Sequence, residues 1–247
     1  YSKVLIPKRM QEEFTCNIEK IIHDGGKRAM LISATGTGKT FASAFAVRKL
    51  FSDNILKNKK ALFLSHREQI NKQPLKSYKR IFGQHIPMEL LSGNQNDVTK
   101  AKSSSFLFST MTMMAKDEIR KQFSPTEYSI IILDECHRSG ADSYQKIIEY
   151  FEPEFLLGMS ASPERTDSFD VFSLFDHNIA CEIRLQQALE NDLLCPFHYF
   201  GITDLEIDGE LDELTKFNVL TSDQRVKHII ERAEYYGFSG ERVKGLV

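Results

Sequence analysis

The stretch TGTGKT, residues 35–40, carries the clearest chemistry in this sequence. It follows a short apolar run typical of a buried parallel strand, and a segment with helical periodicity comes after it. Gly36 and Gly38 allow the backbone to curl so that its N–H groups face an anion. The Lys39 ammonium suits the β- and γ-phosphates of a nucleotide, and the Thr40 hydroxyl suits Mg²⁺. The order of strand, glycine-rich turn and helix predicts a phosphate-binding loop whose nucleotide-binding residues are Thr35, Gly36, Thr37, Gly38, Lys39 and Thr40.

A second polar cluster, Asp134-Glu135-Cys136-His137, follows the most apolar run of the chain, residues 128–133. Carboxylates at the end of such a strand suit magnesium binding and general-base chemistry. We therefore predict that Asp134 holds Mg²⁺ and that Glu135 polarises the attacking water. The alternative is a helix amino terminus, where carboxylates are favoured by the helix dipole. The phosphate-binding loop earlier in the chain favours the catalytic interpretation.

Three further apolar runs end in polar residues. Residues 61–65 precede His66 and Arg67, residues 105–108 precede Ser109 and Thr110, and residues 155–159 precede Ser160-Ala161-Ser162-Pro163. The carboxyl ends of parallel strands meet at one edge of a sheet, which is where ligands bind. Each residue also has an ordinary structural interpretation: Arg67 can open a helix, and Thr110 can cap one.

An amphipathic helix is predicted from Gln11 to His23, ended by the glycines at 25 and 26. The Gln11 side chain could bond an adenine edge, or it could simply be solvated. The recurring strand and helix patterns between residues 29 and 159 predict an α/β fold with a mostly parallel central sheet and helices on both faces. Beyond Asp167 the regular alternation ends. There we expect a helix over 184–194, a strand over 195–202, an acidic loop over 204–213, a helix over 222–236 and the opening of a strand at 243–247.

Bulk properties exclude several classes of protein. In 247 residues, 41% hydrophobic, no apolar run approaches the ~20 residues of a membrane helix, and the amino terminus lacks a signal-peptide pattern. The four cysteines form no CxxC pair, so we interpret them as free thiols of a cytoplasmic protein. Residues 1–100 contain 18 basic and 8 acidic side chains, whereas residues 101–247 contain 14 and 26. The basic half could face a phosphate backbone, or the charges could mix on a solvated surface.

Taken together, these motifs resemble the first RecA-like motor domain of superfamily 2 DExH-box helicases and translocases, over roughly Lys8 to Asp167. Gln11 resembles the adenine-reading Q motif, Ser33 to Thr40 motif I, Phe63 to Gln69 motif Ia, Phe108 to Thr110 motif Ib, Asp134 to His137 motif II, and Ser160 to Pro163 motif III. Arg165, Asp167 and the stretch after them look most similar to bacterial enzymes related to the motor subunits of type I and type III restriction systems.

The resemblance implies a three-layer P-loop NTPase that hydrolyses ATP with Mg²⁺. The residues implied are Lys39, Asp134, Glu135 and His137 in catalysis; Thr40 and Asp134 at the metal; His137, Ser160 and Ser162 in coupling nucleotide state to nucleic acid; and Arg67 and Thr110 on the nucleic-acid backbone. It also implies a nucleic-acid partner, for which we favour DNA, and a nuclease or restriction-type partner domain or subunit.

The resemblance further suggests three parts: a motor domain over 1–180, an appendage or linker over 181–220, and the start of a second RecA-like domain over 221–247. The chain starts at Tyr1 and its last segment resembles the opening of a strand, so we expect a fragment. In this superfamily the resemblance implies that the arginine finger comes from the second motor domain. Because such a finger can contribute ~10³–10⁵ in rate, we expect the fragment alone to be nearly inactive.

Two other functions remain open at this point. An RNA helicase of the same superfamily uses the same tetrad. A nucleotide-gated binding module without motor activity would need the phosphate-binding loop but not the strand-end residues of motifs Ia, Ib and III. A catalytically dead motor is disfavoured by the presence of Lys39, Asp134 and Glu135.

Overall fold

The computed structural model of the chain describes residues 5–66, 68–93, 97–138, 142–164, 170–195 and 223–236. The chain forms two compact units, Tyr1–Cys195 and Pro196–Val247, and each is considered by itself. The predicted division at residues 180 and 220 stays a prediction.

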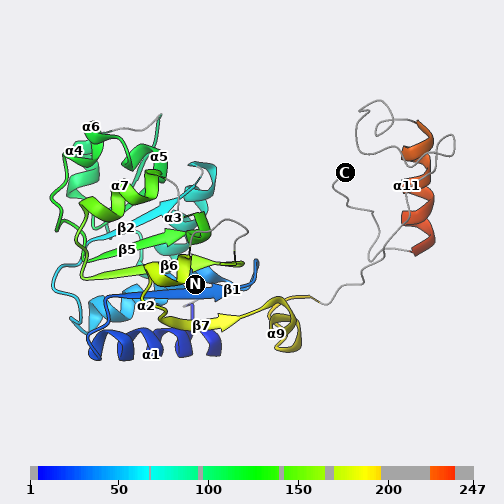
Figure 1. Cartoon of the computed structure of the whole chain (residues 1–247), viewed down its shortest axis with the longest axis horizontal. Helices are drawn as coiled ribbons and strands as arrows, with labels where there is room; N and C mark the ends of the chain where they lie inside the picture. Colours follow the sequence, from blue (N-terminus) through cyan, green and yellow to red (C-terminus); the bar gives the residue numbers. More distant parts are fainter. Residues whose placement is uncertain are drawn as a thin grey trace. The chain divides into compact units, whose positions relative to one another are not determined.

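A parallel sheet organises the first unit (Figure 1). Seven strands of its described residues pair in the order β3-β4-β2-β5-β6-β1-β7, and every pair of neighbours is parallel. The strands are β1 (Arg28–Ser33), β2 (Ala61–Ser65), β3 (Met88–Leu91), β4 (Phe106–Thr110), β5 (Ile130–Asp134), β6 (Phe155–Ser160) and β7 (Ile179–Ile183). Parallel order places all carboxyl ends at one edge, and the polar motifs predicted from the sequence follow those ends.

Two hydrophobic cores lie on opposite faces of the sheet, because successive side chains of a strand point to opposite sides. On β5, Ile130 and Ile132 join one core, whereas Ile131 and Leu133 join the other. All four side chains are at most 2% exposed. Burial on both faces explains why the central strands are continuous apolar runs.

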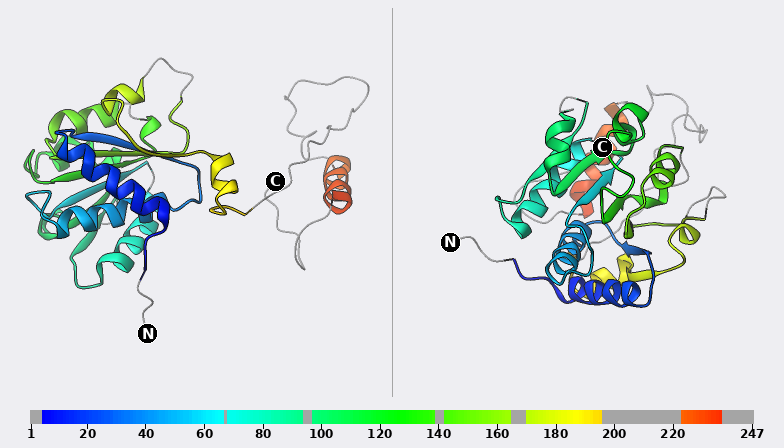
Figure 2. Two further views of the ribbon diagram at one scale, coloured as in Figure 1. Left: turned by 90° about the horizontal axis from the view of Figure 1, so that it is seen from below. Right: turned by 90° about the vertical axis from the view of Figure 1, so that its left-hand side faces the viewer.

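Helices cover both faces (Figures 1 and 2). The core containing Ile130 also includes residues of α1 (Arg9–His23), α2 (Lys39–Ser52) and α3 (Glu68–Phe82). The core containing Ile131 includes residues of α4 (Val98–Ser103), α5 (Met111–Met114), α7 (Asp142–Tyr150) and α8 (Val171–Leu174), and α6 (Asp117–Arg120) packs against it. The helices α1 and α2 run side by side in both figures. The predicted three-layer α/β architecture is confirmed.

One expectation was wrong: strand and helix continue to alternate beyond Asp167. After α8 the chain forms β7 and then α9 (Leu185–Glu190), and β7 pairs with β1 at the edge of the sheet. The helix expected over 184–194 is therefore shorter than predicted. The strand expected over 195–202, the acidic loop over 204–213 and the strand opening at 243–247 fall, apart from Cys195, outside the described residues.

In the second unit the structure describes α11 (Asp223–Tyr236), which matches the helix predicted there. Its apolar residues Val226, Ile229 and Ile230 are 46%, 37% and 52% exposed. Among the described residues of the whole chain, no helix combines the length and apolar character needed to cross a membrane.

Candidate nucleotide-binding site

The loop between β1 and α2 has the backbone shape that its glycines predict. Gly36 and Gly38 have φ angles of +88° and +96°, a region that glycine adopts without steric cost. The Ser33 hydroxyl lies 2.6 Å from the Thr37 hydroxyl, which also donates to the Ala34 carbonyl at 2.7 Å. Ser33 and Thr37 therefore close the loop with a buried pair of hydroxyl groups. The common pattern G-x-x-x-x-G-K-[ST] has glycine at the position of Ser33, so this contact gives the serine a structural role.

Lys39, the first residue of α2, points back into its own loop. Its Nζ donates to the Ser33 carbonyl at 2.9 Å and lies 3.4 Å from the Ala34 carbonyl. Burial lowers the pKa of Lys39, and the carboxylates of Glu135 and Asp134 oppose that effect. The phosphate loop and the acidic cluster at the end of β5 are thus close enough to interact, as the sequence predicts for a single site.

Asp134 ends β5, and Glu135 follows it in a left-handed turn with φ of +52°. The Glu135 backbone N–H donates to Asp134 Oδ1 at 3.1 Å. Burial, with the Glu135 charge second, raises the pKa of Asp134 to about 6, and Lys39 acts against this. A half-buried carboxylate beside a second one gains most from a cation, so the pair suits a divalent metal or a positively charged partner.

His137 connects the acidic cluster to the neighbouring strand. Its Nδ1 lies 3.1 Å from Ser160 Oγ and 3.3 Å from Glu135 Oε2. Ser160 ends β6, which pairs with β5, and its hydroxyl also accepts the Ser162 backbone N–H at 3.2 Å. Glu135, His137 and Ser160 therefore form one connected polar group across the ends of two strands, in which Ser162 takes part through its main chain.

Gln11 lies next to the phosphate loop although it comes from α1. Its Nε2 is 3.2 Å from the position that a Cβ would take on Gly38, and its Oε1 accepts the Lys8 backbone N–H at 3.0 Å. The side chain is 5% exposed, which excludes the solvated alternative. A role in reading adenine stays a prediction.

The two predicted nucleic-acid contacts have different outcomes. Arg67 lies outside the described residues. Thr110 ends β4, is 8% exposed, and caps α5 by accepting the Met113 backbone N–H at 3.2 Å. The capping interpretation is therefore correct for the Thr110 hydroxyl, and a nucleic-acid contact by this residue stays a prediction.

The residues present fit a magnesium ion. Mg²⁺ in phosphoryl-transfer sites takes one or two protein oxygens and completes its shell with phosphate and water. Thr40 at the start of α2 and the half-buried Asp134 carboxylate at the end of β5 supply such oxygens. No group of three or more His, Cys, Asp or Glu side chains arranged for a metal occurs in the described part of the chain.

Comparison with known proteins agrees with this geometry. The family described as "Type III restriction enzyme, res subunit" matches residues 5–165, which span the phosphate loop, the acidic tetrad and the Ser160 turn. The chain belongs to this family. Membership in the type III restriction res-subunit family implies ATP use and confirms the predicted relation to superfamily 2 motors of restriction systems.

The proteins to which this chain is similar include restriction enzymes and helicases. It is 28% identical over 192 residues to an Escherichia coli protein named "Type I restriction enzyme EcoAI endonuclease subunit", covering 76% of this chain and 23% of that one. It is 26% identical over 206 residues to the Saccharomyces cerevisiae "Putative ATP-dependent helicase IRC3", covering 78% and 28%. The chain thus spans about a quarter of the length of these curated relatives.

A solved structure shows the same fold. The Type ISP restriction-modification enzyme LlaGI, in complex with a DNA substrate mimic, superposes with a TM-score of 0.59 at 21% identity, covering 76% of this chain and 21% of that one. At this identity the likeness concerns the fold alone. It confirms the RecA-like architecture predicted for the first domain.

Sequence reasoning missed three contacts around the site. Arg138 lies beside His66, with 3.1 Å between Nη1 and Nε2. Arg184 pairs with Glu164, and Leu194 lies 3.0 Å from the position of a Cβ on Gly36. These partners are 20 to 158 residues apart in the chain, so no local spacing indicates them.

Proposed function

We propose that this chain is an ATP-dependent motor domain that couples ATP hydrolysis to movement along nucleic acid. One arrangement carries the proposal: Glu135, the predicted general base, shares His137 with Ser160 at the sheet edge that also holds Lys39. A simple nucleotide switch needs the phosphate loop alone. A motor also needs a connection from the nucleotide to other strand ends, and His137 with Ser160 provides one.

In this function the side chains have separate tasks. Lys39 leaves the Ser33 carbonyl to hold the β- and γ-phosphates, and the N–H groups of residues 35–40 surround them. Thr40 and Asp134 hold Mg²⁺, which when bound neutralises charge on the phosphates. Glu135 accepts a proton from the attacking water, and His137 holds the Glu135 carboxylate in place. Gln11, whose Nε2 lies beside Gly38, selects adenine.

We propose DNA as the nucleic acid and a nuclease-bearing domain or subunit as partner. The support is family membership together with the name of the Escherichia coli relative, a type I restriction enzyme endonuclease subunit. Backbone contacts by Arg67 and Thr110 belong to this proposal, because phosphate contacts carry no sequence information and so permit movement. A cytoplasmic location belongs to it as well.

The test is the ATPase rate of the full-length protein without nucleic acid and with single-stranded DNA, duplex DNA or RNA. Glu135→Gln is the matched control because it preserves size and hydrogen bonding but not the base. We expect DNA to stimulate the wild-type rate and the variant to lose that stimulation, since general-base catalysis contributes roughly 10²–10⁴-fold.

Two results would contradict the proposal in different ways. Stimulation by RNA alone would preserve the mechanism and overturn DNA as substrate. Equal rates in all four conditions would favour the nucleotide-gated binding module. The low activity expected of residues 1–247 by themselves stays a prediction, and the same assay on that segment tests it.

A further inference from the structure

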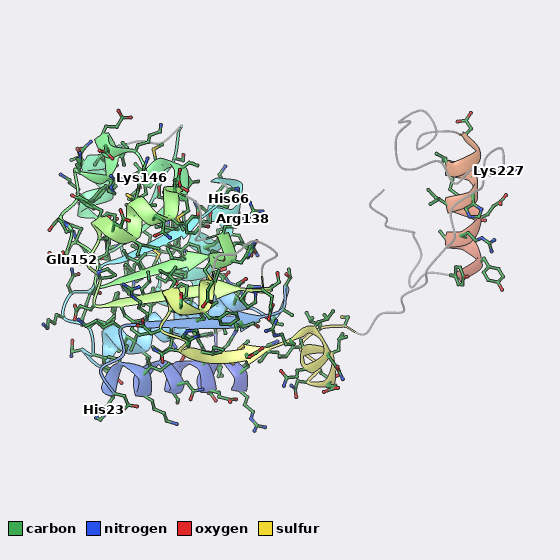
Figure 3. All side chains as sticks on the ribbon, viewed as in Figure 1. His23, His66, Arg138, Lys146, Glu152 and Lys227 are labelled. Atoms are coloured by element: carbon green, nitrogen blue, oxygen red, sulfur yellow. The ribbon has the colours of Figure 1, made fainter. Side chains whose placement is uncertain are left out.

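A second contact between neighbouring strands lies beside the ATPase tetrad. Arg138 Nη1 is 3.1 Å from His66 Nε2, and Figure 3 shows the two labelled side chains next to each other. A guanidinium has only donors, so the His66 nitrogen must be the acceptor. The contact therefore specifies a neutral His66 ring with its proton on Nδ1.

Arg138 is tied closely to the general base. It ends the short 3₁₀ turn η1 (Cys136–Arg138), and its backbone N–H donates to the Glu135 carbonyl at 3.0 Å. Because Glu135, His137 and Arg138 lie within one turn, a shift of the Arg138 backbone displaces the other two. Arg138 therefore moves with the catalytic turn.

His66, the other partner of this contact, lies at the carboxyl end of β2. It follows β2, which pairs with β5 on one side and with β4 on the other. Its predecessor Ser65 is directly opposite Thr110, the last residue of β4. The bond from Arg138 thus extends the group Ser160–His137–Glu135 across β2 toward the strand ends predicted to contact nucleic acid.

The hydrogen bond between Arg138 and His66 contributes little to the stability of the fold. Arg138 is exposed, and a hydrogen bond at such a site contributes little to folding. Its position is more informative, because it joins the turn that carries the general base to the strand end of motif Ia.

We propose that Arg138 and His66 are a positioning pair that transmits nucleic-acid binding to the ATPase tetrad. Nucleic acid bound at the ends of β2 and β4 fixes His66, and His66 fixes the turn through Arg138. Glu135 then stays in the orientation that activates water. This inference rests on the proposed function and adds a defined route between its two sites.

The experiment is a double-mutant cycle in the full-length protein with Arg138→Ala, His66→Ala and both together. Lys146→Ala is the control, since it removes an exposed positive charge from α7, and Figure 3 labels this residue too. The readout is the ratio of nucleic-acid-stimulated to basal ATPase rate, with nucleic-acid affinity measured at several salt concentrations. Coupling free energies between sites typically correspond to 5–150-fold.

We expect each single variant to lower the ratio at least fivefold and the double variant to lower it no further than the worse single one. His66→Gln should restore most of the ratio, because the Gln oxygen can accept from Arg138 near the position of Nε2. Lys146→Ala should behave as wild type. A purely structural role would instead lower the thermal midpoint without rescue by Gln.

Other outcomes overturn the inference. If Arg138→Ala weakens binding and reduces the salt slope by about one while His66→Ala has no effect, Arg138 is a phosphate contact. Additive losses, or no loss in either variant, also refute a shared route. If the wild-type protein shows no stimulation by any nucleic acid, the proposed function fails, and this inference fails with it. The wild-type measurement alone shows that result, so it is distinguishable from a failure of the inference.

Discussion

His137 Nδ1 lies 3.1 Å from Ser160 Oγ, so the histidine of the acidic tetrad is bonded to the end of the neighbouring strand. Since β5 and β6 are paired in register, the backbone positions from which these two side chains meet are fixed by the sheet. The same hydroxyl accepts the Ser162 backbone N–H, which extends the group into the loop after β6.

Ser160→Ala should therefore uncouple the site while Ser162→Ala should not. The first variant removes the only atom of residue 160 that can reach His137, whereas the second preserves the backbone N–H that makes the described contact. We expect stimulated ATPase activity to fall at least fivefold in Ser160→Ala, within the usual range of coupling energies. Equal losses in both variants would show that the Ser162 hydroxyl has a role of its own.

The raised pKa of Asp134, about 6, predicts a pH-dependent stability in the absence of Mg²⁺. A carboxyl whose pKa is raised on folding favours the fold in its neutral form, so its contribution to the free energy of unfolding is lost as pH rises from 3.8 to about 6. Asp134→Asn removes the charge and retains the oxygen that accepts the Glu135 N–H. At pH 8 we expect the variant to unfold about 2–4 °C above wild type, corresponding to roughly 1 kcal/mol.

Thermal unfolding at pH 4 and pH 8 with a chelator tests this. The two proteins should converge at pH 4, where Asp134 is protonated. Adding Mg²⁺ at pH 8 should stabilise wild type and leave the variant unchanged. A difference of the same size at both pH values would mean that the charge of Asp134 is not its cause.

Gly158 is required by packing. An added Cβ would lie 2.4 Å from Cζ of Phe175 and 2.8 Å from two further ring carbons, and the Phe175 ring is fully buried. Gly158→Ala should lower the free energy of unfolding by about 1–3 kcal/mol, as overpacking typically does. Denaturant unfolding measures this. Combining it with Phe175→Leu should cost less than the two single variants added together, and simple additivity would exclude a clash with the ring.

Continuous apolar runs in the sequence predict β1, β2, β4, β5 and β6, whereas β7 has no such run for a physical reason. The segment Ile179–Ile183 lies at the sheet edge, where only Ala180 is fully buried, and it includes Glu182. An edge strand needs apolar side chains at few positions, so its periodicity is weak. The partner β1 and the backbone bond from Ala34 N to Ile183 O at 3.0 Å define it instead.

The candidate site likewise contains residues that the sequence identifies and contacts that it does not. Lys39, Thr40, Asp134 and Glu135 are identifiable because local order of strand, turn and helix restricts their chemistry. The bonds from His137 to Ser160 and from Arg138 to His66 depend on which strands become neighbours, and spacing within the chain contains no such information. Burial of Gln11 against the loop likewise follows from the packing of α1 on α2.

Gly36→Ala should weaken ATP binding, and the cause can be separated into two parts. An L-residue at φ of +88° costs about 1–2 kcal/mol, which would turn the loop N–H groups away from phosphate. The new Cβ would also lie 3.0 Å from Cδ2 of Leu194, whose backbone N–H is bonded to the Ala188 carbonyl at 3.2 Å. Leu194 is half-buried and its side-chain end can move by a few tenths of an ångström, whereas the φ angle cannot relax without opening the loop.

We therefore expect Gly36→Ala to raise the Kd for ATP about 5–30-fold and Gly36→Ala/Leu194→Ala to recover no more than twofold of it. Equilibrium titration with a fluorescent ATP analogue gives both values, and Leu194→Ala alone serves as the control for the loss of the leucine. Full recovery in the double variant would assign the defect to Leu194. The segment after α9 would then limit the space available at the phosphate loop, and backbone strain would not.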